Sequence, residues 1–599
     1  MLVSTNTPAG LNLSWTGIFN LQESDNLQTW TVVPGATSPR SVTATGIPRR
    51  FFRLATIADK VIRNAKIHTV DDAQPLATTL AIKNGTLIYV GNGPATEFTG
   101  ATTEIIDAGG RLVLPGFQDT HVHAVEAGIN ETVPTFPQFG TQAQYATALQ
   151  EALASQPGAA SDWVLGAGVN MSALSTTLIS PSPLALIDSI IPSRPAIILD
   201  DLGHGIWANT KALQAVGFDQ LASNPQGGVL GTDANGNLNG IIYESASQNL
   251  IDAAQPPTVA RLEAVYQAFR GTLAKFATNG ITTVSDAGGY RLRGHHTIWA
   301  RAETEGTLTV RAVNAFYIYP EKPYAQQVAD VTALFSNDPL KLVRFNSVKI
   351  YTDGIISQGT AALLQPYEAG AALIPGVGNT GSTYFNTSTL NNYAAAFEAA
   401  GFKIHFHATG DRGARLALDA IAHARTNNNI ADRRHRITHL YMVDAADRPR
   451  FPQLGVFADF QLAPSSLAQD ATTEATSFIG SSRMSGYLPL GSMLTAGADI
   501  TLSSDYDADE LSPFIKIKTA VTRPTQGVPD VTTAIRLMTL NPARMLSHDD
   551  RTGSLKVGKL ADLIILNQDI LTIPAANIHT TKVLLTLLGG NQVYRAVGF

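Results

Sequence analysis

The chain has 599 residues, of which 44% are hydrophobic and 15% charged, and its formal net charge is -6. This length exceeds what one hydrophobic core supports, so we expect two or three domains. The weakly negative charge, without a Lys/Arg cluster, argues against nucleic-acid binding, and the absence of cysteine excludes disulfides, thiolate metal sites and a cysteine nucleophile.

Residues 1–57 contain short strand-like runs separated by turn residues: LNLSW, TWTVV, SVTATG and RFFRLA. They predict a small β module, which resembles a compact module appended to exported bacterial proteins and would tether the chain to a surface or glycan. The alternative is an extension that packs on the main body. We see no signal peptide and no run of the roughly 18 apolar residues that a membrane span needs. The compartment stays open: cytoplasmic, or exported with the leader absent from this chain.

The segments 58–114 and 546–599 are both rich in strand-like runs, for example TLAIKNGTLIYVG in the first and GSLKVGKLADLIILN in the second. Asn-Gly and Gly-Gly pairs between the runs are typical of tight turns. Two β-rich flanks on either side of a long middle segment predict one composite β-sandwich built from both ends of the chain.

The stretch LPGFQDTHVH ends in two histidines separated by one residue, His121 and His123. In an extended strand side chains alternate between faces, so both imidazoles point the same way. Two neutral imidazoles on one face can hold zinc or another divalent metal. The alternative is one buried and one solvated histidine.

Between the flanks, residues 115–545 alternate strand-like and helical runs, which predicts parallel strands with crossover helices. About eight such units fit a (β/α)₈ barrel with insertions. We expect the segment 205–250, which is rich in Gly, Asn and Asp, to be a loop. The expected strands are PAIILDD, GITTVSDAG, VRAVNAFYIY, SVKIYTDG, FKIHFHATG, HRITHL, GVFADFQ and ADITLSSD.

Enzymes with this fold carry their chemistry at the carboxyl ends of the barrel strands. Polar residues that can bind metal or protons end several of the apolar runs: His121, His123, Lys349, His405, His407, His439 and Asp505. Each could be an ordinary interior residue. Together they predict one metal site at the rim of the barrel.

These stretches resemble the metal-dependent amidohydrolase superfamily, and within it the YtcJ-like branch, amidohydrolase family 3, which includes N-substituted formamide deformylases. The resemblance covers residues 60–599 and rests on ordered motifs, among them LPGFQDTHVH, VKIYTDG, HFHATGDRGA, RITHL, LSSDYD and MTLNPARML.

The resemblance implies a ligand set for one or two zinc ions, with other divalent metals also acceptable: His121, His123, Lys349, His407, His439 and Asp505. Lys349 would be N-carboxylated and bridge two metals; otherwise it is no ligand and pairs with Asp353. The position of His407 next to Ala-Thr-Gly-Asp favours it over His405, which we expect to be an interior residue.

The resemblance also implies that Asp505 shuttles protons and that His204 donates a hydrogen bond to the developing oxyanion. His204 could instead only brace a loop. Two departures from the branch are Gly205 and Ile355, where serine is usual, and Glu244 matches a branch position without a firm role.

Bound metal lowers the pKa of water and generates hydroxide at neutral pH. Together with this chemistry, the resemblance implies a hydrolase for a C–N bond in a small amide, such as an N-acyl or N-formyl amine. Two alternatives stay open, an ester or lactone hydrolase with the same site and a barrel that binds ligand without turnover. The sequence does not indicate whether the chain forms a homo-oligomer.

Overall fold

The computed structural model describes residues 2–7, 10–16, 19–28, 30–43, 49–176, 179–430 and 434–599. The chain forms two compact units. The first contains residues 1–117, 548–574 and 580–599, and the second contains residues 118–547 and 575–579.

The first 57 residues contribute two small antiparallel sheets to the first unit. The strands of one are β1 (Val3–Thr7), β2 (Gly10–Ser14) and β5 (Arg40–Val42); those of the other are β4 (Thr31–Val32), β3 (Phe19–Ser24) and β6 (Phe51–Thr56). Leu13, Trp15 and Leu21 form their shared apolar core. The strand character expected for this segment is thus observed, whereas its independence as a module stays a proposal.

Strands from both flanks pair in one sheet of the first unit. β13 (Leu112–Pro115) pairs with β27 (Leu563–Leu566), which continues into β28 (Val583–Leu588) and β29 (Asn591–Arg595); β8 (Lys66–His68) and β9 (Leu76–Ala77) complete the sheet. A second sheet contains β11 (Thr86–Gly91), β10 (Thr79–Lys83), β7 (Lys60–Arg63) and β12 (Glu104–Asp107). Ile62 and Leu80 of one sheet and Val113 and Ile565 of the other share a buried cluster, as the predicted composite sandwich requires.

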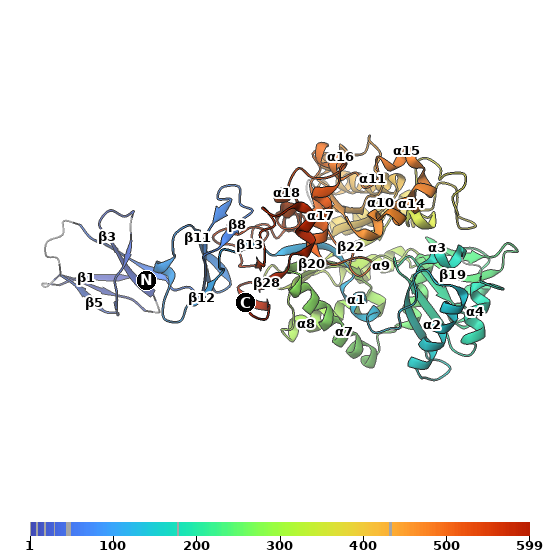
Figure 1. Cartoon of the computed structure of the whole chain (residues 1–599), viewed down its shortest axis with the longest axis horizontal. Coiled ribbons are helices and arrows are strands. Elements are labelled where there is room, and N and C mark those ends of the chain that lie inside the picture. The colour runs from blue at the N-terminus through green and yellow to red at the C-terminus, as the bar shows by residue number, and fades with distance from the viewer. Residues whose placement is uncertain are drawn as a thin grey trace. The chain divides into compact units, whose positions relative to one another are not determined.

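The second unit is built on eight parallel strands, which confirms the predicted (β/α)₈ barrel (Figure 1). In sheet order they are β14 (Phe117–Val122), β20 (Ile281–Gly289), β21 (Arg311–Tyr317), β22 (Val343–Tyr351), β23 (Lys403–Ala408), β24 (Arg436–His439), β25 (Phe457–Phe460) and β26 (Ile500–Leu502). The Asp505 amide donates to the His121 carbonyl at 2.9 Å, and Val122 bridges to Tyr506. These contacts join the last strand to the first.

Helices follow most of the barrel strands. They include α1 (Ala124–Asn130), α7 (Val259–Thr278), α8 (His295–Thr304), α9 (Tyr324–Thr332), α10 (Thr387–Ala399), α11 (Asp411–Asn428), α12 (Arg450–Leu454), α16 (Leu490–Thr495), α17 (Pro513–Thr522), α18 (Val531–Leu537) and α19 (Leu540–Met545). The stretches 260–279 and 389–401, ARLEAVYQAFRGTLAKFATN and TLNNYAAAFEAAG, form α7 and α10. Short helices α13 (Pro464–Leu467), α14 (Gln469–Ile479) and α15 (Ser481–Met484) follow β25.

The segment between β14 and β20 contains an insertion that corrects two sequence predictions. Residues 205–250, expected to be a loop, supply strands β17 (Gly205–Ala208), β18 (Gly228–Thr232) and β19 (Leu238–Glu244) and helices α5 (Thr210–Ala215) and α6 (Ser245–Ala254). PAIILDD, expected in the barrel, forms β16 (Ala196–Asp200) of the same sheet, beside β15 (Val164–Val169). Helices α2 (Gln142–Ser155), α3 (Met171–Thr176) and α4 (Pro183–Ile190) accompany this five-stranded sheet, coloured teal to green in Figure 1.

Two buried clusters explain why the insertion forms a sheet. Trp207 and Ile241 pack with Ile198 on one side, while Ile206 and Ile242 pack with Ile197 on the other. Alternate residues of three strands thus fill both faces, and the turn residues of 205–250 only connect them.

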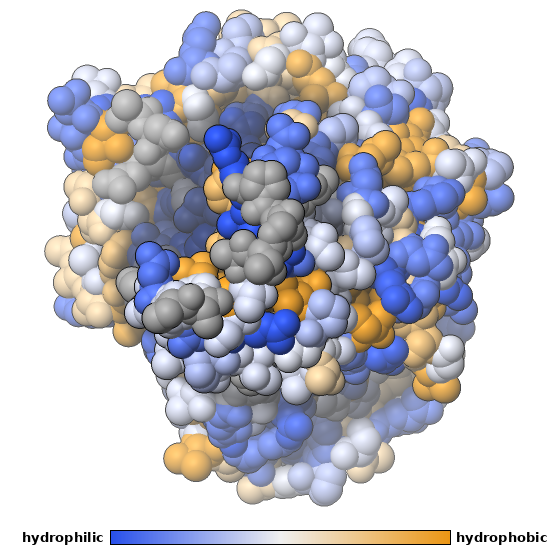
Figure 2. Space-filling model, turned by 90° about the vertical axis from the view of Figure 1, so that its left-hand side faces the viewer, coloured by the Kyte–Doolittle hydropathy of each residue, from blue (hydrophilic) through white to orange (hydrophobic). Residues whose placement is uncertain are grey.

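On the face shown in Figure 2, hydrophilic and hydrophobic side chains are interspersed. Within the described part of the chain, no helix has the length and apolar character needed to cross a membrane.

Candidate metal centre

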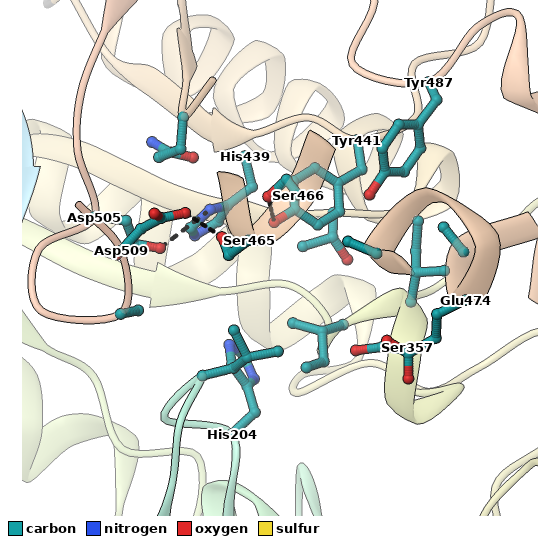
Figure 3. Close-up of a pocket in the computed structure, with 18 of the residues that line it drawn as sticks. His204, Ser357, His439, Tyr441, Ser465, Ser466, Glu474, Tyr487, Asp505 and Asp509 are labelled. Carbon is teal, nitrogen blue, oxygen red and sulfur yellow. Dashed lines mark hydrogen bonds and ion pairs between the residues drawn. The ribbon is translucent and has the colours of Figure 1, made fainter. Parts of the chain in front are cut away.

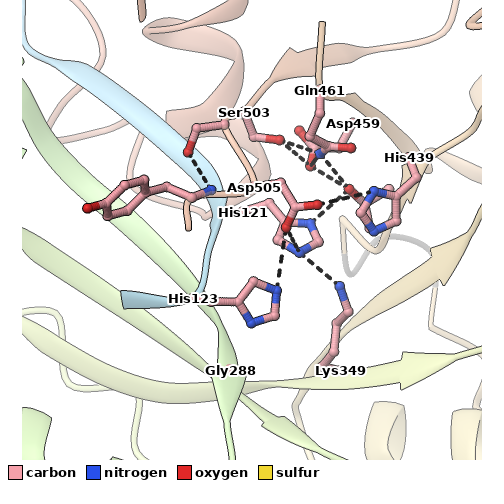
Figure 4. Close-up of polar contacts among 12 residues, drawn as sticks. His121, His123, Gly288, Lys349, His439, Asp459, Gln461, Ser503 and Asp505 are labelled. Carbon is pink, nitrogen blue, oxygen red and sulfur yellow. Dashed lines mark hydrogen bonds and ion pairs between the residues drawn. The ribbon is translucent and has the colours of Figure 1, made fainter. Parts of the chain in front are cut away.

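Three predicted ligands meet at the barrel mouth, where β14 and the segment after β26 come together (Figure 4). Asp505 Oδ1 lies 3.3 Å from His121 Nε2 and 3.4 Å from His123 Nε2. One ligand atom from each of the three residues lies within 4.8 Å of the others. The backbone of Asp505 has φ of 60°, in the left-handed region that non-glycine residues rarely adopt and that is frequent at functional sites.

Each of the two histidines is held through its other ring nitrogen. His121 Nδ1 lies 2.9 Å from Thr438 Oγ1, and His123 Nδ1 lies 3.1 Å from Glu126 Oε2. Such partners fix the ring orientation and the tautomer of a metal-binding histidine. Both rings therefore present Nε2 toward Asp505.

Lys349, on β22, lies next to His121. Its Nζ is 3.0 Å from His121 Nε2, and the residue is fully buried. Burial lowers the pKa of this amine to about 7. The pairing with Asp353, the alternative considered from sequence, is not observed: the Asp353 carboxylate accepts instead from the amides of Ala362 and Gly410 at 2.8 and 2.9 Å.

The next two strands deliver His407 and His439, whose ring centroids are 4.3 Å apart. His439 Nδ1 lies 3.8 Å from Asp505 Oδ2, and His407 Nε2 lies 3.2 Å from the Gly354 carbonyl. Among the buried polar atoms of the described residues, His407 Nδ1 has no hydrogen-bond partner. All six predicted ligands thus gather at one end of the barrel.

His405 lies deeper in the barrel than His407, two residues earlier on β23. Its ring packs edge-on against His121 with centroids 4.7 Å apart, and its Nδ1 accepts from Arg436 Nη2 at 2.6 Å. His405, His121 and Asp459 could form a second group of ligand atoms. Arg436 beside His405 disfavours a cation there, because like charges repel.

His204 reaches the site from the insertion, between β16 and β17. Its ring lies against His407 with centroids 5.1 Å apart, and Nδ1 is 2.7 Å from Glu244 Oε2. Glu244 is buried and has φ of 57°. Its carboxylate also accepts from Tyr384 Oη at 2.6 Å and from Thr360 Oγ1.

Gly354 allows this approach of Glu244. A Cβ atom at position 354 would lie 2.0 Å from Glu244 Oε1, far inside van der Waals contact. Asp353 and Gly354, the last two residues of the motif VKIYTDG, therefore have different structural roles. The aspartate holds the loop, and the glycine leaves room for the Glu244 carboxylate.

A cavity of about 80 Å³ lies above the histidines (Figure 3). His204, His407, His439 and Asp505 line one part of it, and Tyr441, Tyr487 and Glu474 line another. In Figure 3, Asp505 and His439 lie on the opposite side from Glu474. A small chemical group of a substrate in this cavity would contact the candidate ligands.

The protonation states of the histidines are those expected around a bound cation. Burial keeps the pKa of His121 and His407 well below the usual value and lowers that of His439 to about 3, so these rings are neutral. Burial also acts against protonation of His123, but hydrogen bonds to Asp505 and Glu126 raise its pKa to about 10. The carboxylates of Asp505 and Glu126 thus stabilise one positive charge in the site, on His123.

The spacing of the atoms fits a divalent metal. Ligands bound tetrahedrally at about 2.1 Å are separated by about 3.4 Å, close to the two separations measured around Asp505 Oδ1. A cation there would replace the positive charge on His123. The donor set of imidazoles and a carboxylate is one that zinc and other divalent transition metals accept.

Two supporting residues were missed in the sequence. Glu126 follows His123 by three residues on α1, and Asp459 accepts hydrogen bonds from Thr438 and Ser503, both at 2.9 Å. An acidic residue inside the apolar run GVFADFQ is a signal that could have identified Asp459. The contact between His204 and Glu244 had no such signal, since His204 lies in the loop before β17 and Glu244 ends β19, 40 residues later.

A parallel barrel with imidazoles, a lysine and a carboxylate at the carboxyl ends of its strands defines the class of barrel hydrolases that depend on a metal. The sequence profile of the amidohydrolase family matches residues 104–594. The chain belongs to this family, which confirms the resemblance seen in its motifs.

Two relatives and one solved structure extend this comparison. Protein LONG AFTER FAR-RED 3 of Arabidopsis thaliana is 27% identical over 90% of this chain and 92% of its own length. The N-substituted formamide deformylase of Arthrobacter pascens is 24% identical over 91% of this chain and 100% of its own length. An uncharacterised metal-dependent hydrolase from Pyrococcus horikoshii has the same fold, with a TM-score of 0.65 and 20% identity, covering 86% of this chain and 99% of that one.

Proposed function

We propose that the protein hydrolyses a C–N bond of a small amide, an N-acyl or N-formyl amine, with one or two zinc ions or other divalent metals at the barrel mouth. The observation that carries the proposal is the meeting of Asp505 with His121 and His123 at ligand spacing. Similarity to a formamide deformylase over nearly the whole chain supports the choice of bond.

The ligands would divide into two groups. His121, His123 and Asp505 would hold the first cation, and His407 and His439 would hold the second. Lys349 contacts His121 of the first group, and its charge acts on both histidines of the second. Its lowered pKa leaves part of the amine neutral near pH 7. A neutral amine adds to carbon dioxide, so we propose that Lys349 is N-carboxylated and bridges the two positions.

A divalent cation, when bound, lowers the pKa of water and polarises a carbonyl group. The protein supplies the remaining steps. The Asp505 carboxylate accepts a proton from the attacking water and passes it to the leaving nitrogen. His204 is held through Nδ1 by Glu244 and lines the cavity. In the imidazolium form its Nε2–H can donate to the oxygen on which negative charge develops.

The test is removal of metal by a chelator, followed by reconstitution with zinc, manganese or cobalt. We expect one or two ions per chain and metal-dependent hydrolysis of an N-formyl amine. The matched formate ester serves as the comparison substrate. Turnover of the ester alone would favour an ester hydrolase, and no metal-dependent turnover of either would contradict the proposal.

A further inference from the structure

A second, larger cavity adjoins the candidate metal centre. It has a volume of about 1140 Å³ and lies between the insertion and helices α13 and α14. Leu202, Ser357 and Glu474 line both this cavity and the small one above the histidines. The two spaces therefore adjoin at these residues, and the larger one exceeds the size of most small-ligand sites.

The charged residues that line the larger cavity are all acidic. Asp201, Asp470 and Glu474 line it, and no Lys, Arg or His is among the described residues of its wall. Burial raises the pKa of Glu474, and the negative charges of Asp201 and Asp470 add to this effect. A positive charge brought into the cavity would relieve this repulsion.

The other wall residues suit the same kind of ligand. Aromatic rings of Phe139, Tyr243 and Phe478 line the cavity, and such rings attract cations through their faces. Gln358 is only 4% exposed, and its Oε1 has no hydrogen-bond partner among the described residues. A buried acceptor without a donor is costly, and Gln358 belongs to the wall of this cavity.

We propose that this cavity holds the end of the substrate remote from the scissile bond, and that this end carries a protonated nitrogen. The inference rests on the proposed amide hydrolysis and specifies its substrate: an N-acyl amine with an ammonium or a comparable cationic group on its tail. The carboxylates select the charge, and the aromatic wall accepts the apolar chain that leads to it.

The kinetic test compares two formamides of equal length, N-(4-aminobutyl)formamide and N-pentylformamide. We expect kcat/KM to favour the cationic substrate about tenfold or more at low salt, with the preference falling as sodium chloride is added. Glu474→Gln should reduce the preference about tenfold, and Asp470→Asn, at an exposed position, should reduce it less. Glu151→Gln removes the same charge from an exposed position on α2 and should leave the ratio unchanged.

A binding test separates this inference from the proposed function. The sulfonamides N-(4-aminobutyl)methanesulfonamide and N-pentylmethanesulfonamide carry the same two tails and resist hydrolysis. By calorimetry with the zinc-loaded protein, we expect the cationic compound to bind about tenfold more tightly, and the difference to vanish when Glu474 and Asp470 are both neutralised. Equal affinities, no binding of the cationic compound at millimolar concentration, or a difference that survives the double substitution would overturn the inference, whether or not formamides are cleaved.

Discussion

Asp505 is the residue whose role can be separated most cleanly from metal binding. Asparagine keeps the size and an oxygen ligand but cannot accept a proton. We therefore expect Asp505→Asn to retain nearly all of its metal and to lose about 10² to 10⁴ in kcat. Metal analysis and steady-state kinetics on the same preparation check this.

The control for this substitution is Asp499→Asn. Asp499 pairs with Arg544 at 3.4 Å and does not reach the cavity, so we expect its neutralisation to leave kcat within about twofold. Unchanged turnover in Asp505→Asn would remove Asp505 from the mechanism.

Glu244 acts on the site through His204. Replacing it by glutamine keeps the size but weakens the hydrogen bond that fixes the imidazole, so we expect Glu244→Gln to lower kcat about 10- to 100-fold with little change in KM. In a His204→Ala background the same change should have almost no further effect on kcat, because the residue through which it acts is gone.

The four proteins of this double-mutant cycle are to be compared by kinetics and by thermal unfolding. Effects on kcat that multiply in the double variant would show that Glu244 acts independently of His204. If His204→Ala alone had no effect, His204 would have no role in the reaction.

At the residue scale the sequence predicted that the candidate ligands gather at one rim, but it did not predict the residues that hold them in place. His121 and His123 could be placed on one face because strand side chains alternate, and strand ends in a parallel barrel meet at one rim. The partners Glu244 and Asp459 act across strands, and pairing between distant strands leaves no local pattern.

At the scale of elements, Asn209 holds the insertion together. Its side chain accepts from the amides of Ala196 and Ala212 and donates to the carbonyls of Ile191 and Arg194, at 2.7 to 2.9 Å. Asn209→Ala would leave these buried groups without partners, at a cost of about 3 kcal/mol or more.

We expect this loss to appear as faster hydrogen exchange in β16 and β17, measured by mass spectrometry. The exposed Asn235→Ala, in a turn of the same insertion, should change exchange little. Equal exchange in wild type and Asn209→Ala would contradict the assigned role.

The insertion also shows where prediction from sequence ends at this scale. PAIILDD is buried between two layers, as barrel strands are, so its apolar run could not distinguish the five-stranded sheet from the barrel. In the segment 205–250, frequent turn residues concealed short strands whose burial depends on partners elsewhere in the chain.

At the scale of the whole molecule, acid sensitivity is expected from His295. Its Nδ1 lies 2.9 Å from the Gly288 carbonyl, and burial lowers its pKa to about 4. The unfolded chain takes up the proton near pH 6.5, whereas the folded protein does not. The folded state therefore loses up to about 3 kcal/mol of stability as the pH falls from 6.5 to 4.

His295→Asn removes this titration and keeps a donor for the Gly288 carbonyl. Urea unfolding at pH 7 and pH 4.5 should show a smaller loss of the free energy of unfolding in the variant than in wild type. The same pH dependence in both would show that His295 does not contribute to acid sensitivity.

The pairing of β13 with β27 imposes an order on biosynthesis. The two partners come from opposite ends of the chain. One edge of β13 therefore stays unpaired until almost all of the protein has been translated. Protease digestion of nascent chains stalled before residue 563 should cut residues 60–115 readily, and release of the full chain should protect them. The segment from residue 563 onward is thus needed to cover the edge of β13. A chain terminated before this segment would expose an unpaired strand edge, which cellular quality control would recognise.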